Sequence, residues 1–377
     1  MLLFSVQQKN VRHMVETPKV ESALIAELLD ALKRLPDVAV DLARQSDVGG
    51  HVAGIDVQIS MQVAGRSIAL LIEIRKTLYP RDVRQALWQI RDAAARRDGK
   101  TDADPSVPLL AAESISPGAK ELLQVARVGY FEAGGSLYLP VPGAIFFVDK
   151  PPSKSTSRAI RSLYSGRRAH VLHGLLMRRE DWLGVTELAE DVSAAPSTVS
   201  LVLTELERLD WLDSRGQGPG KQRRVSQPAA LLDAWATSLK QQDVEPMRRF
   251  FIPALKADAL AIGLDKVCAS RVIDYAVTHE AAAQRYAPFL SNVSSVRLRM
   301  PAGTASEGAL GELGARSVSE GANLMVIDSK SPGDLLFRRR VSGVWLASPI
   351  QVYLDLVRSE GRAKELAEHL RKTTIGF

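Results

Sequence analysis

The stretch VTELAEDVSAAPSTVSLVLTELERL, residues 185–209, carries the clearest fold signal in the chain. Its first part, up to Val192, has the apolar spacing of a short helix, and residues 193–195 provide a tight turn. Pro196 suits the first position of a second helix, because the amide hydrogen that proline lacks would be unpaired there. In this second helix the apolar residues recur with a period of 3.6: Val199, Val202, Leu203, Leu206 and Leu209. The pattern predicts a helix-turn-helix.

The other face of the second helix consists mainly of small side chains. Small side chains let a helix lie deep in the major groove of DNA, and hydroxyl groups there can reach base edges. We therefore expect DNA contacts from this face: Ser197, Thr198, Ser200, Leu201 and Thr204. A preceding helix, predicted around Arg167–Arg179, adds Arg167 and Arg168 as candidate DNA contacts.

A glycine-rich basic loop follows the two helices. Trp211–Ser214 is predicted to begin a strand, and Arg215–Val225 loops back into a second strand. The loop contains no acid, and its cations are Arg215, Lys221, Arg223 and Arg224. Helices followed by such a hairpin predict a winged helix-turn-helix, similar to that of many bacterial transcriptional regulators, with the loop as a wing on DNA phosphates.

Charge placement supports this interpretation, but alternatives stay open. Lys154–Arg179 holds seven Lys and Arg residues and no acid. Winged helices also serve as protein-docking modules, and basic runs are often only solvated faces. His170 and His173 have a spacing that metal ligands use on helices, but no Glu or Cys stands in register with them, which favours packing or surface roles.

Composition limits the classes of protein that remain. The chain has 377 residues, 46% hydrophobic and 24% charged, as expected for a globular protein of two or three domains. Its apolar runs are shorter than the ~20 residues that span a bilayer, and its single cysteine, Cys268, allows no internal disulfide. We therefore expect a cytoplasmic protein without membrane contact or cofactor. The net charge of +6 leans weakly towards an anionic partner.

Two breaks divide the chain. A Pro/Ser-rich stretch at 150–157 and a second break near Gln241–Pro246 give segments 1–150, 151–240 and 241–377. We expect an α/β multidomain protein, with a mixed α/β N-terminal domain, the central winged helix and a C-terminal α/β domain. For the last segment we predict helices and strands at Pro253–Leu260, Ser270–Tyr275, Ala281–Tyr286, Val293–Met300 and Asn323–Ile327.

The first segment predicts a mixed sheet flanked by helices, in the order α-β-β-β-α-β-α-β-β. The named elements are Val20–Leu35, Gly54–Val63, Arg66–Ile74, Pro80–Arg97, Val107–Ala112, Pro117–Ala126, Tyr130–Leu139 and Ala144–Val148. Strict apolar alternation marks Gly54–Val63 as a half-buried strand, and Ala64-Gly65 can close a two-residue hairpin. If Val63 pairs with Arg66, the register places Asp56 opposite Glu73 on one face of the sheet.

Asp56, Glu73 and Arg75 form a nuclease-like constellation. Two carboxylates and a cation on adjacent strands suit a metal-dependent phosphodiesterase, because Mg²⁺ prefers oxygen ligands. The region resembles the PD-(D/E)xK endonuclease fold, followed by a helix with Gln85 and Gln89. Arginine stands at the family's lysine position and cannot be deprotonated to act as a base. We expect a degenerate site with Asp56 and Glu73 as vestigial metal ligands; an ion-pair cluster and an unrelated α/β domain are the alternatives.

The end of the chain carries a second resemblance. The stretches LASPIQVYLDL (346–356) and GRAKELAEHLR (361–371), after YAVT (275–278) and Ala281-Ala282, resemble the C-terminal region of AbiEi-type antitoxins of type IV toxin–antitoxin systems. The resemblance implies a transcriptional regulator that represses its own operon and counteracts a nucleotidyltransferase-like toxin. We therefore expect a DNA-binding protein without enzyme activity, with double-stranded DNA, such a toxin and a second copy as candidate partners. The alternative is a metal-dependent nuclease that its winged helix delivers to DNA.

Overall fold

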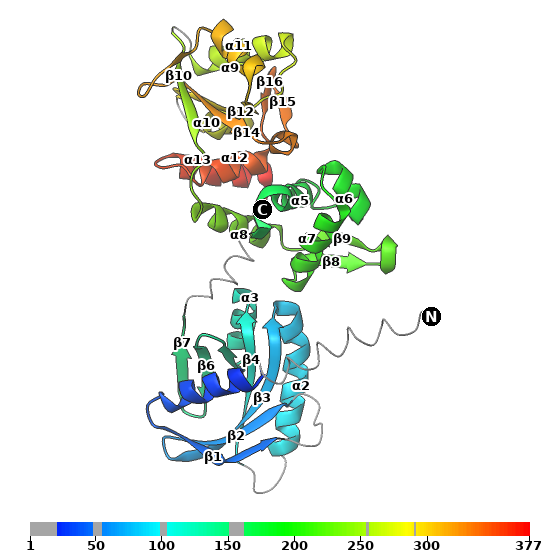
Figure 1. Ribbon diagram of the computed structural model, residues 1–377, viewed down its shortest axis with the longest axis vertical. Coiled ribbons are helices and arrows are strands. Elements are labelled where there is room, and N and C mark those ends of the chain that lie inside the picture. Colours follow the sequence, from blue (N-terminus) through cyan, green and yellow to red (C-terminus); the bar gives the residue numbers. More distant parts are fainter. Residues whose placement is uncertain (1–20, 48–54, 99–103, 151–161, 254–255, 290–291) are drawn as a thin grey trace, which may run out of the picture. The chain divides into compact units, whose positions relative to one another are not determined.

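The computed structural model describes residues 21–47, 55–98, 104–150, 162–253, 256–289 and 292–377. The chain forms two compact units, Met1–Ala159 and Ile160–Phe377, and both are mixed α/β (Figure 1). Within the described ranges, the longest helices are too short or too polar to cross a bilayer.

A seven-stranded mixed sheet organises the first unit, with its strands in chain order across the sheet. The central strand β4 pairs in parallel with β3 and with β5, and all other neighbouring strands of this sheet pair antiparallel. The strands are β1 (Val38–Asp47), β2 (Val57–Val63), β3 (Arg66–Leu78), β4 (Ser106–Ile115), β5 (Gly129–Glu132), β6 (Ser136–Val141) and β7 (Ala144–Val148). The predicted strand Tyr130–Leu139 is thus two strands joined by a turn, because Gly134 and Gly135 both have positive φ.

Helices cover both faces of this sheet (Figure 1). The helix over residues 21–33 packs Leu28 and Leu32 against Ile59 and Leu70 on one face. Helices α2 (Pro80–Asp98) and α3 (Pro117–Val125) pack on the other face, where Ile90 lies in the second apolar cluster. The mixed sheet flanked by helices is confirmed.

The register predicted for the β2–β3 hairpin is confirmed. Val63 pairs with Arg66 and Val57 with Ile72. The turn residues Ala64 and Gly65 have φ values of 48° and 78°, the pair of positive angles of a type I′ turn. One step beyond β2, the amide of Asp56 donates to the carbonyl of Ile72 at 2.8 Å, so the Asp56 side chain reaches the level of Glu73.

The second unit begins with helices and a short hairpin. Its elements are α5 (Gly166–Met177), α6 (Val185–Asp191), α7 (Pro196–Arg208), β8 (Leu212–Arg215), the turn η1 (Gly218–Gly220), β9 (Gln222–Val225) and α8 (Pro228–Lys240). Pro196 is the first residue of α7, as predicted. A backbone bridge between Leu183 and Arg223 ties β9 to the segment before α6.

A second seven-stranded mixed sheet follows, in the order β13-β10-β14-β12-β11-β16-β15. Its strands are β10 (Met247–Phe251), β11 (Ala276–Thr278), β12 (Val296–Pro301), β13 (Arg316–Ser317), β14 (Leu324–Ser329), β15 (Arg339–Val341) and β16 (Val344–Leu346). Its helices are α9 (Ala257–Ser270), α10 (His279–Tyr286), α11 (Thr304–Glu312), α12 (Pro349–Leu356) and α13 (Ala363–Leu370), with turns η2 (Pro332–Leu335) and η3 (Arg371–Ile375). The predicted helix Ser270–Tyr275 is wrong, because Val272 has a φ of 54° and the chain then enters β11.

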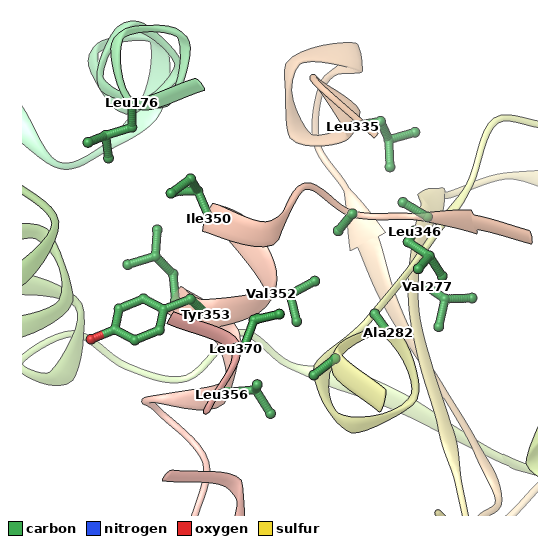
Figure 2. Close-up of a cluster of buried hydrophobic side chains, with 14 of the residues drawn as sticks. Leu176, Val277, Ala282, Leu335, Leu346, Ile350, Val352, Tyr353, Leu356 and Leu370 are labelled. Carbon is green, nitrogen blue, oxygen red and sulfur yellow. The ribbon is translucent and has the colours of Figure 1, made fainter. Parts of the chain in front are cut away.

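One apolar core runs through the whole second unit. Figure 2 shows Leu176 of α5 beside Ile350 of α12, while Val352 on the same helix faces Val277 and Leu346 of the sheet. The predicted break near 150 lies close to the division between the units. The predicted break at 240–241 lies inside the second unit, because the two predicted domains share this core.

Candidate nucleic-acid interface

Helix α7 separates its side chains as its sequence predicts. Val199, Val202, Leu203 and Leu206 are buried, whereas Ser197, Ser200 and Thr204 are exposed and Thr198 is half-buried. Leu201 lies on the same exposed face, with 61% of its surface accessible to solvent. The Thr204 hydroxyl donates to the carbonyl of Ser200 at 2.8 Å and keeps its lone pairs for a further donor. An exposed leucine among hydroxyls is the surface that a thymine methyl and base edges can meet.

Two cations of the hairpin stack on a tryptophan. The guanidinium groups of Arg215 and Arg224 lie 4.5 and 4.8 Å from the centre of the Trp182 ring. Arg215 donates from Nε and a terminal nitrogen to the Gln222 amide oxygen at 3.0 and 2.8 Å. The stack orients both side chains while leaving charge at the surface, which suits contacts with phosphates.

The other two predicted wing cations have a different role. Arg223 is only 8% exposed, and its Nε donates to Glu207 of α7 at 2.9 Å. Lys221 Nζ lies 2.7 Å from the same carboxylate oxygen. Burial alone would raise the pKa of Glu207, but the hydrogen bonds from Lys221 and Arg223 outweigh burial and lower it. The expectation that Arg223 contacts phosphate is therefore corrected: it holds β9 against α7.

The arginines at the start of α5 contact backbone and hydroxyl groups. Arg167 is exposed and donates to the carbonyl of Ser193 in the turn between α6 and α7 at 2.8 Å. Arg168 is half-buried and donates to Ser162 Oγ at 2.8 Å. Both bonds use neutral acceptors, and Arg167 brings its positive charge to the turn before α7. Of the predicted basic run, Lys154, Arg158 and Arg161 lie outside the described residues.

His170 and His173 of α5 pack against the C-terminal part of the unit and do not converge on one site. His173 Nε2 lies 2.5 Å from Ser348 Oγ, and its ring meets Phe337 edge-on at 5.0 Å. Burial lowers the pKa of His173 to about 3, so the ring is neutral. His170 Nε2 lies 3.5 Å from Asp334 Oδ1. Both histidines therefore have packing roles, one of the two roles that the sequence favoured for them.

The structure places Asp56 at the level of Glu73, and within the nuclease-like constellation Glu73 pairs with Arg75. Glu73 is 1% exposed and accepts a hydrogen bond from Arg75, and its Oε2 has no hydrogen-bond partner among the described residues. Asp56 Oδ2 accepts from the amide of Ile74 at 2.6 Å. Burial raises the pKa of Glu73, with the charge of Asp56 adding to the effect and Arg75 opposing it. In the described part of the chain, three or more His, Cys, Asp or Glu residues do not gather anywhere as a metal site.

Comparison with known proteins identifies no relative: protein-family models give no match, and a search of curated proteins finds no significant similarity.

Two residues escaped the sequence interpretation. Trp182 carries the arginine stack, and Glu207 pairs with both Lys221 and Arg223. The available signal for Glu207 is its position one turn after the buried Leu203 on the same helix. The only sequence signal for Trp182 is its position shortly before helix α6.

Proposed function

We propose that the protein is a DNA-binding transcriptional regulator whose residues 160–240 form a winged helix-turn-helix. Helix α7 enters the major groove, and the β8–β9 hairpin is the wing. The observation that carries the proposal is the exposed face of α7, where Leu201 is 61% exposed among Ser197, Ser200 and Thr204. The arginines stacked on Trp182 support a phosphate contact by the hairpin.

A pair of matched substitutions tests this proposal. Leu201→Glu places a carboxylate on the proposed reading face, whereas Val125→Glu places one at another exposed apolar residue, on α3, where Val125 is 84% exposed. Binding is measured by fluorescence anisotropy on a duplex from upstream of the protein's own gene and on a scrambled duplex. We expect Leu201→Glu to abolish preference for the upstream duplex and Val125→Glu to leave it intact. Equal binding by both variants would sink the assignment of α7.

We further propose that the C-terminal part is antitoxin-like and binds a nucleotidyltransferase-like toxin. The resemblance in this region includes Ser348, which caps α12, and Asp355, which is buried and accepts from Thr278, Arg299 and Gln351. The contacts of these residues stabilise the fold of the unit. The resemblance therefore supports a shared fold more directly than it supports a shared toxin partner. Co-purification with a nucleotidyltransferase encoded beside this gene tests the proposed toxin partner. A nuclease encoded at that position, or the absence of a co-purifying protein, would contradict the proposal.

A metal-dependent nuclease is the second candidate, supported by the opposition of Asp56 and Glu73. The residues present do not fit a divalent cation, because the Arg75 guanidinium holds one oxygen of Glu73 and places a positive charge beside the other, while Asp56 Oδ2 already accepts from a backbone amide. We therefore expect no Mg²⁺- or Mn²⁺-dependent nicking of plasmid DNA. Robust nicking that Glu73→Gln abolishes would reverse the choice between the two functions.

A further inference from the structure

Strand β7 forms an edge of the sheet in the first unit and carries exposed apolar side chains (Figure 1). Ile145 is 61% exposed and Phe147 is 56% exposed, and both lie on the same face of the strand because side chains alternate. The strand has the sequence AIFFV, without a charged residue or a proline. Edge strands are commonly protected by such residues, so an unprotected apolar edge is typical of a surface that pairs with another strand.

The main chain of Ile145 and Phe147 is directed towards the open edge. Strands β6 and β7 are joined by a two-residue turn, and the residues that close such a turn form a hydrogen-bonded pair. The next pair, Pro140 and Ile145, is therefore non-hydrogen-bonded, which suits a proline without an amide hydrogen. Tyr138 and Phe147, two steps further, form a pair of the same kind. Among the described residues, the main chain of Ile145 and Phe147 makes no hydrogen bond beyond the sheet.

We propose that β7 pairs with β7 of a second copy of this chain, antiparallel and across a two-fold axis at Phe146. The register that satisfies the outward main chain places Ile145 of one copy opposite Phe147 of the other. Symmetry repeats this pair, and each occurrence exchanges two N–H···O bonds. On the exposed face, a β-branched side chain then contacts an aromatic one across the strands, a kind of pair that stabilises sheets.

A second copy fits the charge distribution along β7. In this register the uncharged residues 144–148 of the two copies lie opposite each other, and Asp149 of one copy stands opposite Gly143 of the other. Like charges are therefore not brought together, whereas a charged peptide would meet no opposite charge along residues 144–148. Two short strands bury less area than the roughly 1,200–2,000 Å² of a standard interface, so we expect a weak dimer with a Kd on the order of 10 µM.

Sedimentation velocity of the full-length protein between about 1 and 200 µM should show the wild type passing from monomer to dimer. Ile145→Lys with Phe147→Lys places lysine opposite lysine and removes the apolar contacts, which should weaken dimerisation by at least ~10-fold. Ile145→Lys with Phe147→Glu places lysine opposite glutamate in the same register and should recover at least ~4-fold of that loss. Trp88→Lys with Val272→Lys changes two exposed apolar residues outside β7 and should dimerise as the wild type does.

Oxidative cross-linking gives a readout that does not depend on the charge variants. Phe146→Cys lies on the proposed axis, where opposed Cα atoms of a non-hydrogen-bonded pair are about 4.5 Å apart, within the range of a disulfide. Ala144→Cys is the matched control, because the two copies of this residue are separated by about 13 Å along the strands. The buried Cys268 is common to both variants. We expect a disulfide-linked dimer from Phe146→Cys on a non-reducing gel and a monomer from Ala144→Cys.

The inference is overturned if the wild type stays monomeric up to about 200 µM, well above the expected Kd. It is also overturned if the two charge variants dimerise with equal affinity, or if Ala144→Cys cross-links as readily as Phe146→Cys. Growth beyond a dimer would indicate open-ended pairing with a different strand and would contradict the two-fold axis. The regulator proposal is tested separately through Leu201 of the second unit, so either one can fail while the other stands.

Discussion

Arg223 and Arg224 are adjacent in the sequence and differ in what surrounds them. Arg223 is buried against Glu207, whereas Arg224 lies over Trp182 and 3.3 Å from the exposed carboxylate of Asp213. Since side chains alternate along a strand, neighbours on β9 face opposite sides. Two arginines that look equivalent in a basic loop therefore differ: Arg223 holds β9 against α7, whereas Arg224 stays at the surface, where the proposed wing needs it.

Arg223→Ala should destabilise the protein. Removing one member of a buried ion pair leaves Glu207 with Lys221 as its remaining partner, and the expected loss is about 3 kcal/mol of unfolding free energy. Urea denaturation followed by circular dichroism measures it. Arg224→Ala is the matched control and should lose less than about 1 kcal/mol, because its pair with Asp213 is exposed. Equal losses would contradict the division of roles.

His173 predicts a pH dependence of stability. The pKa of this histidine is 6.5 in the unfolded chain and is lowered by burial to about 3 in the folded one. Below pH 6.5 the unfolded chain therefore binds a proton that the folded chain does not, and stability falls as the pH decreases from 6.5 towards 3. The slope is at most ~1.4 kcal/mol per pH unit.

His173→Gln should reduce the slope of unfolding free energy against pH, while the contributions of other buried titratable groups to that slope stay the same. Burial also lowers the pKa of His279, which is present in both proteins and cancels in the comparison. Denaturant midpoints at pH 7 and pH 5 for wild type and variant provide the measurement. The prediction fails if the two proteins lose the same stability between these pH values.

Helix α7 carries a buried core face and, opposite it, the exposed face that we propose reads DNA. Thr198→Ala and Ser200→Ala each remove a hydroxyl from the proposed reading side, and neither side chain belongs to the apolar core. We expect each to narrow the affinity gap between the upstream and scrambled duplexes by about 2- to 13-fold, the worth of a single hydrogen bond to a base edge. The slope of log K against log[salt] should stay within about 0.5 of wild type, because no phosphate contact is lost. A changed slope with an unchanged affinity gap would show that these hydroxyls contact DNA phosphates and not base edges.

Elements were predictable from sequence where a local pattern decides them. Strict alternation and the two-residue turn at Ala64-Gly65 fixed the β2–β3 register, and Pro196 marked the start of α7. The turn after Ser270 was not predictable, because it depends on a positive φ at Val272, which is rare for a β-branched residue and which its 93% exposed side chain does not signal. The contact between Glu207 and Arg223 joins two elements, and apolar spacing within either one contains no information about it.

The second unit should unfold as a single cooperative body. His173 contacts Ser348, Arg371 pairs with Asp233, and the apolar core continues from α5 to α12. A fragment of residues 160–240 should therefore lose a cooperative thermal transition, because removing α12 exposes Leu176 and Trp235. The fragment 160–377 should keep that transition, as followed by circular dichroism. A cooperative melt of 160–240 alone would contradict the shared core and restore a boundary at 240.

The most direct test of DNA binding by the second unit is a salt titration of duplex affinity. Arg215→Ala with Arg224→Ala is compared with wild type and with Arg362→Ala, a control whose side chain is 70% exposed at the start of α13. The proposed wing predicts that the double variant weakens upstream and scrambled duplexes alike and that its slope of log K against log[salt] falls by about 1 to 2, at ~0.9 per phosphate. The control should keep the wild-type slope. An unchanged slope in the double variant would show that the hairpin does not contact the phosphates.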